Sequence, residues 1–100
     1  MQLPSISAAE ALILELLEVR ERYGLELVER SNGRLKRGSV YVTLARMEQK
    51  GFVTSREEDR STPPSGPLRR LYQPTPYGLK VRDAYFLLRE ALALKPAEAQ

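Results

Sequence analysis

Residues 59–67 form a segment, Asp-Arg-Ser-Thr-Pro-Pro-Ser-Gly-Pro, that neither a helix nor the interior of a sheet can accommodate. Residues 52–55, just before it, are rich in strand formers, and Leu71 and Tyr72 lie in a second strand-forming stretch after it. The sequence therefore predicts a β-hairpin with a long, exposed loop. Helical patterns precede and follow this hairpin.

The first helix is expected to begin at Ser7, because Ser7 and Glu10 have the spacing of a capping box. A charged break follows the helix at residues 20–22. Apolar residues recur within it at three- and four-residue intervals, so one stripe is expected to face a core while the glutamates face water. The stripe consists of Ala9, Leu12, Ile13, Leu16, Leu17 and Val19.

Two more helices are expected between this break and the hairpin. A short one opens near residue 23 and stops at the turn formed by Asn32 and Gly33. The next begins within residues 37–39 and ends at Gly51, which favours the left-handed conformation of a helix cap. Its buried stripe is expected to comprise Val40, Leu44 and Met47.

A last helix is predicted after the hairpin, with Thr75 as its N-cap and Pro76 in its first position. Its apolar stripe is longer than a small core covers from one side, so we expect this helix to pack against the same helix of a second copy. A helix folded back on its own domain is the alternative. The stripe consists of Tyr77, Val81, Ala84, Tyr85, Leu88, Ala91 and Leu92.

Composition indicates one folded domain: the chain has 100 residues, of which 42% are hydrophobic and 29% charged. The formal net charge is +3, and the stretch from Arg34 to Lys50 holds five basic residues against the single acid Glu48. Such a local excess of positive charge favours a polyanion as partner.

Several function classes are excluded by what the sequence lacks. Without Cys or His there are no disulfides, no thiolate or imidazole catalysis and no zinc site of the usual ligands. A glycine-rich phosphate loop and a nucleophile paired with a base are also missing, so we expect no enzyme, no metal and no cofactor. The chain has neither a membrane-spanning apolar run nor the basic start of a signal peptide, which indicates a cytoplasmic protein with no membrane partner.

The order helix, helix, helix, strand, loop, strand, helix describes a mainly α fold with a small β-hairpin, the winged helix-turn-helix. Within that order, three stretches resemble the PadR family of transcriptional regulators. Residues 13–17 (ILELL) followed by 23–27 (YGLEL) resemble the opening of the family, and residues 38–53 (GSVYVTLARMEQKGFV) resemble its recognition-helix signature, G-T-L-Y-x-x-L-x-R-L-E-x-x-G-L-I. The spacing of its wing, G-x-x-R-[RK]-x-Y-x-x-T-x-x-G, is matched by Gly66, Arg69, Arg70, Tyr72, Thr75 and Gly78.

The resemblance implies the short form of the family. Residues 1–76 would be the winged helix-turn-helix DNA-binding domain, with the wing at about 56–72, followed by a C-terminal dimerisation helix over 77–94 and a tail over 95–100. Pro74 departs from the pattern by replacing an aliphatic strand residue, and the family's usual proline before the wing arginines is missing. Because proline removes a donor from a sheet, the second strand is expected to end early or to lie at an edge.

The function implied is a sequence-specific DNA-binding repressor that binds double-stranded DNA as a homodimer, on a palindromic operator. Side chains on the third helix would enter the major groove, where Arg46 would pair with guanine or with a phosphate. Tyr41 is either a half-buried packing residue or a phosphate contact. Cations before the helix would hold phosphates, and the wing arginines would lie along the backbone or in a minor groove. The predicted DNA-binding residues are Lys36, Arg37, Ser39, Tyr41, Val42, Thr43, Arg46, Arg69 and Arg70.

The last helix carries the predicted dimer interface. The resemblance implies that a small-molecule effector, where one is used, binds near this interface. Tyr77, Tyr85, Phe86 and Leu88 are candidates to line such a site, although plain packing within the dimer is the commoner role of such residues. The predicted dimerisation residues are Tyr77, Val81, Ala84, Tyr85, Leu88 and Leu92.

A second function class fits the same pattern: a winged-helix protein-interaction module whose basic surface is incidental and whose last helix binds a different protein. A steep fall of DNA affinity with salt would distinguish DNA binding from this alternative, because phosphate binding releases counterions.

Overall fold

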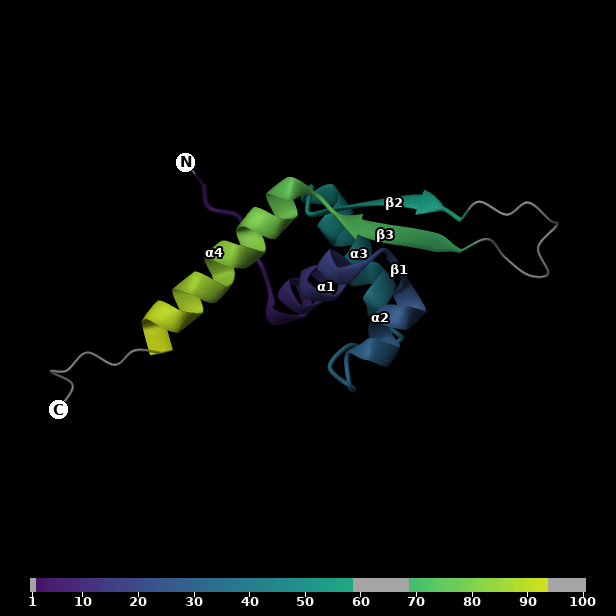
Figure 1. Cartoon of the computed structure of the whole chain (residues 1–100), viewed down its shortest axis with the longest axis horizontal. Coiled ribbons are helices and arrows are strands. Elements are labelled where there is room, and N and C mark those ends of the chain that lie inside the picture. Colours follow the sequence, from purple (N-terminus) through teal and green to yellow (C-terminus); the bar gives the residue numbers. More distant parts are fainter. Residues whose placement is uncertain (1, 59–68, 94–100) are drawn as a thin grey trace, which may run out of the picture.

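The computed structural model describes residues 2–58 and 69–93, so the predicted loop over residues 59–67 lies outside the described part. Figure 1 shows the helices and one small sheet. The elements, in chain order, are α1 (Ala8–Val19), β1 (Arg22–Tyr23), α2 (Gly24–Arg30), α3 (Val40–Gln49), β2 (Val53–Glu57), β3 (Arg70–Pro74) and α4 (Pro76–Ala93).

Local signals set the helix boundaries as expected. At the start of α1, Ser7 Oγ accepts from the Glu10 amide at 3.1 Å, and a Glu10 carboxylate oxygen accepts from the Ser7 amide at 2.8 Å, which completes the capping box. After α2 the chain turns through left-handed residues, Asn32 with φ 54° and Gly33 with φ 85°. Gly51, with φ 81°, ends the helical segment of α3 in the same way.

The sheet contains one strand more than the sequence predicted. β2 and β3 pair as an antiparallel hairpin from Val53 opposite Pro74 to Glu57 opposite Arg70. The short strand β1 adds to the other side of β3, giving the order β1-β3-β2. Of the two alternatives predicted for this strand, the edge position is wrong because β3 lies in the middle, whereas an early end agrees with Pro74 as its last residue. Pro74 is tolerated because it is the last residue of β3 and β1 reaches only as far as Tyr72.

The core lies between the three N-terminal helices and the sheet. Val40, Leu44 and Met47 are buried, as the third-helix stripe predicts. The cluster is completed by Leu12, Ile13, Leu14, Leu17, Leu27, Leu35, Phe52, Val53, Tyr72 and Val81.

Two expectations for the first helix are wrong. Val19 was assigned to the buried stripe but is 74% exposed, because α1 ends there and the chain turns away. Glu10 was expected to face water and is buried, because its carboxylate completes the capping box and pairs with Lys50 at 2.8 Å. The neighbouring charged break also contains a buried cation, Arg22, whose Nε donates to the Leu16 carbonyl at 3.0 Å.

Helix α4 has two different halves. Its first half packs on the body of the protein: Gly78, Val81 and Arg82 are buried, and Arg82 pairs with Glu18 of α1 at 2.6 Å. Its second half projects beyond the rest of the described structure, as Figure 1 shows. Among the described residues, no helix is both long and apolar enough to cross a membrane.

Candidate nucleic-acid interface

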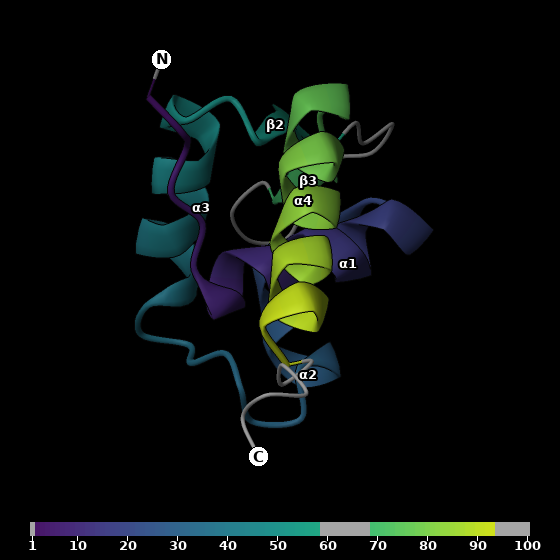
Figure 2. The same ribbon diagram turned by 90° about the vertical axis from the view of Figure 1, so that its left-hand side faces the viewer.

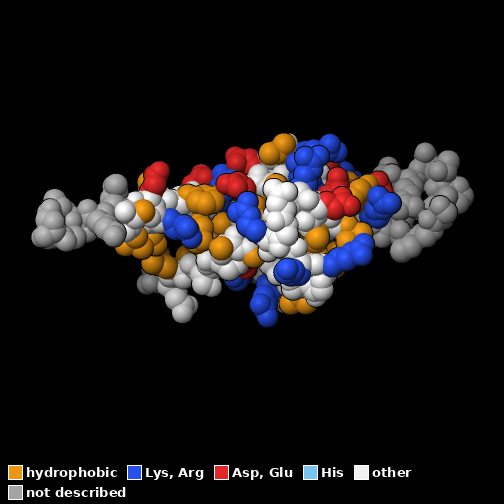
Figure 3. Space-filling model, turned by 90° about the horizontal axis from the view of Figure 1, so that it is seen from below, with side chains coloured by type: hydrophobic (Ala, Val, Ile, Leu, Met, Phe, Trp, Pro, Cys, Tyr) orange, Lys and Arg blue, Asp and Glu red, His pale blue; other side chains and the backbone are white. Residues whose placement is uncertain are grey.

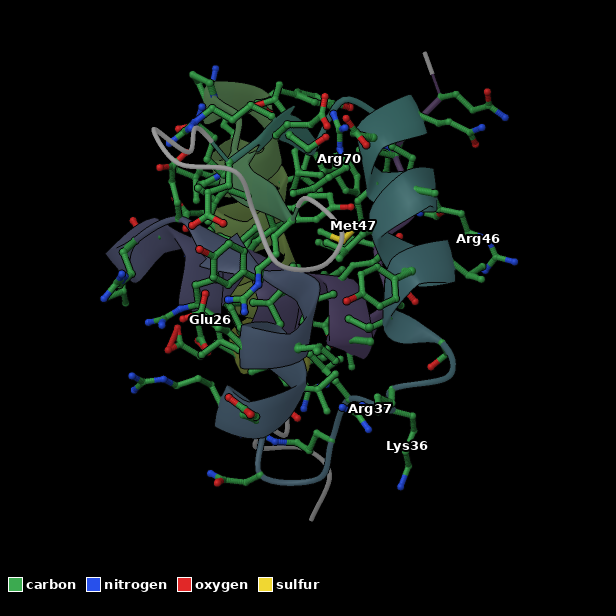
Figure 4. The ribbon with its side chains drawn as sticks, turned by 90° about the vertical axis from the view of Figure 1, so that its right-hand side faces the viewer. Glu26, Lys36, Arg37, Arg46, Met47 and Arg70 are labelled. Carbon is green, nitrogen blue, oxygen red and sulfur yellow. The ribbon has the colours of Figure 1, made fainter. Side chains whose placement is uncertain are left out.

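Helix α3 turns its predicted reading residues outward. Val42 is 54% exposed, and Ser39 and Arg46 are exposed as well. Thr43 is half-buried, and its hydroxyl donates to the Ser39 carbonyl at 3.1 Å, which leaves its oxygen free to accept. Figure 4 shows Arg46 pointing away from the body while Met47 points inward. One face of α3 is thus available to a partner along most of its length.

Two of the predicted phosphate-binding cations lie in the turn that leads into α3. Lys36 and Arg37 are exposed, and the Lys36 carbonyl accepts from the amides of Ser39 and Val40, which folds this turn onto the helix. Within residues 2–58 and 69–93, neither cation makes an ion pair. In Figure 4, Lys36 and Arg37 lie near the N-terminal end of α3. In the part of the chain that the structure describes, no carboxylate therefore compensates their positive charges.

Lys50 has a different role from these cations, although the sequence counted it in the same basic stretch. Its ammonium group contacts both carboxylate oxygens of Glu10, at 2.8 and 3.1 Å, and the Ser5 carbonyl at 3.1 Å. The excess of positive charge near α3 is accordingly smaller than composition suggested. No periodicity could reveal this pair, because its partners are 40 residues apart in the chain.

Tyr41 lies at the boundary between packing and exposure. Its side chain is 50% exposed, and its ring covers Gly24 at the start of α2, so closely that a Cβ on Gly24 would stand 2.6 Å from ring carbon Cε1. A side chain at residue 24 would therefore have to push the end of the Tyr41 ring aside. Tyr41 is therefore not a core residue, and its role as a phosphate contact stays a prediction.

The hairpin is connected to α3 through a polar chain. Arg70 Nε donates to Ser55 Oγ at 3.2 Å, and the Ser55 hydroxyl donates in turn to the Glu48 carboxylate at 2.8 Å. These three residues come from β3, β2 and α3. Figure 4 shows Arg70 on the sheet side of α3. The wing and the exposed helix face are thus held in a fixed relation.

Arg69, the other predicted wing cation, lies over the ring of Tyr23 with its guanidinium carbon 4.9 Å from the ring centre. This is the geometry of a cation–π contact. The Tyr23 hydroxyl donates to the Glu58 carboxylate, and this hydrogen bond raises the pKa of Tyr23 above 10.0, with Arg69 acting in the opposite direction. The strand β1, which sequence reasoning missed, therefore supports the base of the wing.

The predicted dimerisation residues separate into two groups. Val81 is buried in the core of its own chain, and Tyr77 packs against Phe52 with 5.8 Å between ring centres. Leu88 and Leu92 are 59% and 74% exposed. Sequence reasoning did not name Leu87, and it named Phe86 only as a candidate to line an effector site. The exposed apolar residues in the second half of α4, here called the α4 face, are Phe86, Leu87, Leu88 and Leu92, whereas Tyr77, which is 47% exposed, lies in the first half.

The fold and this surface together define a winged helix-turn-helix: three helices, the third with an exposed face, followed by a hairpin joined to that helix. The sequence model of the transcriptional regulator PadR-like family matches residues 13–84, which is most of the chain. The protein belongs to this family. A comparison with curated proteins found no significant match.

Solved structures agree with this assignment. A PadR family transcription regulator from hypervirulent Clostridium difficile is 27% identical, with a TM-score of 0.74 over 87% of this chain and 92% of that one. A PadR-like transcriptional regulator from Bacillus cereus is 24% identical, with a TM-score of 0.65 over 84% of this chain and 82% of that one. Bacillus subtilis PadR, solved in complex with operator DNA, is 20% identical, with a TM-score of 0.68 over 83% of this chain and 48% of that one. The last two show the fold alone.

Proposed function

We propose that this protein is a cytoplasmic, sequence-specific repressor of transcription that binds a palindromic DNA operator as a homodimer. The observation that carries the proposal is the outward face of α3, where Val42, Thr43 and Arg46 are accessible beside the uncompensated cations Lys36 and Arg37. A helix of this size fits the major groove, and such side chains supply both base-reading and phosphate-holding contacts. The Bacillus subtilis relative, solved with operator DNA, supports the same class of partner.

The kind of DNA contact proposed for each residue follows from its place in the fold. Ser39, Val42 and Thr43 would meet base edges or a thymine methyl group, and Lys36 and Arg37 would hold phosphates beside the groove. Tyr41 would reach a phosphate with its hydroxyl group. Arg69 and Arg70 would follow the DNA backbone or enter a minor groove from the base of the wing. The DNA-binding domain would then end where α4 begins, and α4 would serve dimerisation.

The second half of α4 would form the dimer interface, because its apolar residues are exposed among the described residues of the single chain. Tyr85, Leu88 and Leu92 belong to this interface together with Phe86 and Leu87, whereas Tyr77 and Val81 support the helix from its own core side. A twofold dimer built on α4 presents two α3 helices to half-sites about one DNA turn apart.

Any small-molecule effector would bind near this interface, where Tyr85 and Phe86 form an edge-to-face pair with 5.3 Å between ring centres. Planar hydrophobic compounds are the chemistry that such rings accept. An effector is expected to raise the melting temperature and to change the DNA affinity. Compounds that leave both unchanged would count against this site.

Selection of bound sequences from a random duplex pool, at low and at moderate salt, tests the proposal. We expect a palindrome whose half-sites lie about one turn apart, with affinity falling steeply as salt rises. Failure to enrich any sequence at either salt concentration would contradict the proposal and favour a protein-interaction module, whose partner would then be sought on the α4 face.

A further inference from the structure

A hollow of about 280 Å³ lies between the N-terminal arm, residues 2–7, and the exposed side of α3. Figure 2 shows the arm running beside α3. The arm is attached there, because Lys50 at the end of α3 donates to the Ser5 carbonyl at 3.1 Å. The polar residues that line the hollow are Ser5, Ser7, Glu10, Thr43, Arg46 and Lys50.

The side chains around the hollow supply hydrogen-bond donors and one uncompensated positive charge. The carboxylate of Glu10 is buried and already accepts from the Ser7 amide and from Lys50, so its charge is neutralised within the protein. Arg46 makes no ion pair within the described residues, and the Ser5 hydroxyl has no partner there either. A guanidinium group and a free hydroxyl on opposite walls suit a single anionic group.

The position of the hollow indicates where that anion would come from. The major groove is about 12 Å wide, and a helix with its side chains is about 10–12 Å across, so α3 would fill the groove. A segment beside the helix cannot enter with it and comes to lie against the edge of the groove. Phosphate groups line that edge.

We propose that this hollow binds one backbone phosphate of DNA, held by the guanidinium group of Arg46 and the hydroxyl group of Ser5. The inference rests on the proposed function and makes the N-terminal arm a second DNA-contacting element. Arg46 becomes a phosphate contact rather than a base-reading residue. Lys50 and Glu10 line the hollow as well, but their charges pair with each other, and they act as positioning residues because they fix the arm beside α3.

The first test compares Ser5→Glu with its neutral counterpart Ser5→Gln, by fluorescence anisotropy on a labelled random-sequence duplex. Ser5 is exposed, so both variants should melt at the wild-type temperature. The added carboxylate would face the phosphate, and we expect Ser5→Glu to bind DNA about tenfold more weakly than Ser5→Gln. If the two variants bind DNA equally well while the wild type also binds, the phosphate site in the hollow is contradicted and the proposed function is not. Failure of the wild type to bind any duplex would instead overturn the proposed function.

The second test concerns Arg46 and the salt dependence of binding. If Arg46 holds a phosphate, Arg46→Ala should reduce the slope of log affinity against log salt by about 0.9 for each bound subunit, on operator and random DNA alike. Ser5→Gln, which changes no charge, should leave the slope unchanged. An unaltered slope in Arg46→Ala, with affinity lost on the selected operator only, would overturn the assignment and make Arg46 a base contact.

Free phosphate could supply the same chemistry, and a titration of DNA-free protein with inorganic phosphate distinguishes the two sources. Amide resonances of the arm and of α3 should show no saturable shift. Saturable binding of inorganic phosphate that leaves DNA affinity unchanged would overturn the assignment to the DNA backbone.

Discussion

Thr75 and Gly78 join the end of β3 and the start of α4 to the turn after α3. The Thr75 hydroxyl donates to the Gly51 carbonyl at 2.6 Å, and its oxygen accepts from the Gly78 amide at 2.8 Å, so one side chain caps α4 and fastens it to that turn. Gly78 allows α4 to approach the backbone of Phe52, because a Cβ would stand 2.9 Å from Phe52 Cα and closer still to its carbonyl oxygen. This contact explains the Thr-x-x-Gly spacing in physical terms.

Gly78→Ala is expected to lower the free energy of unfolding by about 3 kcal/mol, because the new methyl group must displace backbone rather than a flexible side chain. Urea denaturation followed by circular dichroism measures the loss. Gly38→Ala is the matched control, since a Cβ at Gly38 meets no atom within 4 Å. A Gly78→Ala protein as stable as the control would show that α4 can shift without cost.

Tyr72 should make the fold sensitive to alkaline pH. Burial of its ring raises the pKa of Tyr72 above 10.0, with Glu48 adding to the shift and Arg70 opposing it. Because the unfolded chain releases this proton first, the stabilising contribution is complete below about pH 10 and is lost as pH rises through the folded value. Urea midpoints from about pH 8 to pH 11 should therefore fall more steeply for the wild type than for Tyr72→Phe. Parallel curves would show that the phenol ionises freely.

At the scale of elements, apolar periodicity and caps predicted the four helices and the hairpin strands, because those signals are local. Strand β1 was missed because two residues carry no periodicity, and its Arg22 stands in a run of charges that normally faces water. The burial of Arg22 depends on the pairing of β1 with β3, in which Arg22 lies opposite Tyr72, some 50 residues later in the chain. No local pattern encodes such a pairing. The burial of Glu10 escaped prediction for the same reason, since its partner Lys50 follows α3 and is 40 residues away in the chain.

For the candidate site too, the local features were predictable from the sequence and the tertiary contacts were not. The stripe of Val40, Leu44 and Met47 determined which side of α3 faces outward, and the structure has that orientation. The contacts of the wing arginines could not be foreseen, because Arg69 rests on Tyr23 of the unpredicted strand. The N-terminal arm beside α3 was not recognised as part of the candidate DNA-binding surface, since its residues carry no charge and show no apolar periodicity. Tertiary contacts decided each of these features.

The attachment of α4 to α1 depends on the buried Arg82, whose pKa is raised chiefly by its hydrogen bond to Glu18. A double-mutant cycle with Arg82→Met and Glu18→Gln should give a coupling free energy of about 0.5–1 kcal/mol, at the level of an exposed pair, because Glu18 remains in contact with water. Asp83→Asn is the control, since it removes a carboxylate from Arg82 without touching α1. Zero coupling would mean that apolar packing alone holds the two helices.

At the scale of the whole molecule, the protein is a body with one projecting helix. In Figure 3 the orange side chains gather toward the end where α4 projects, while many of the blue ones lie over the centre and the other end. The junction of Thr75 and Gly78 lies between these regions, so the direction of α4 is fixed relative to α3. Two copies joined through α4 would therefore present their α3 helices at a fixed spacing, which is what a palindrome with regular half-site separation requires.

Leu88→Lys is expected to convert the proposed dimer into monomers, because it places a charge on the α4 face. Leu25→Lys is the matched control: Leu25 is also an exposed apolar residue, but it lies on α2. Sedimentation equilibrium should give half the wild-type mass for Leu88→Lys and the full mass for the control. Each monomer still carries an intact α3, so binding to a single half-site should persist while affinity for the palindrome falls by about 100-fold or more. A Leu88→Lys protein that remains dimeric and keeps its affinity for the palindrome would place the interface elsewhere and leave the α4 face to another partner.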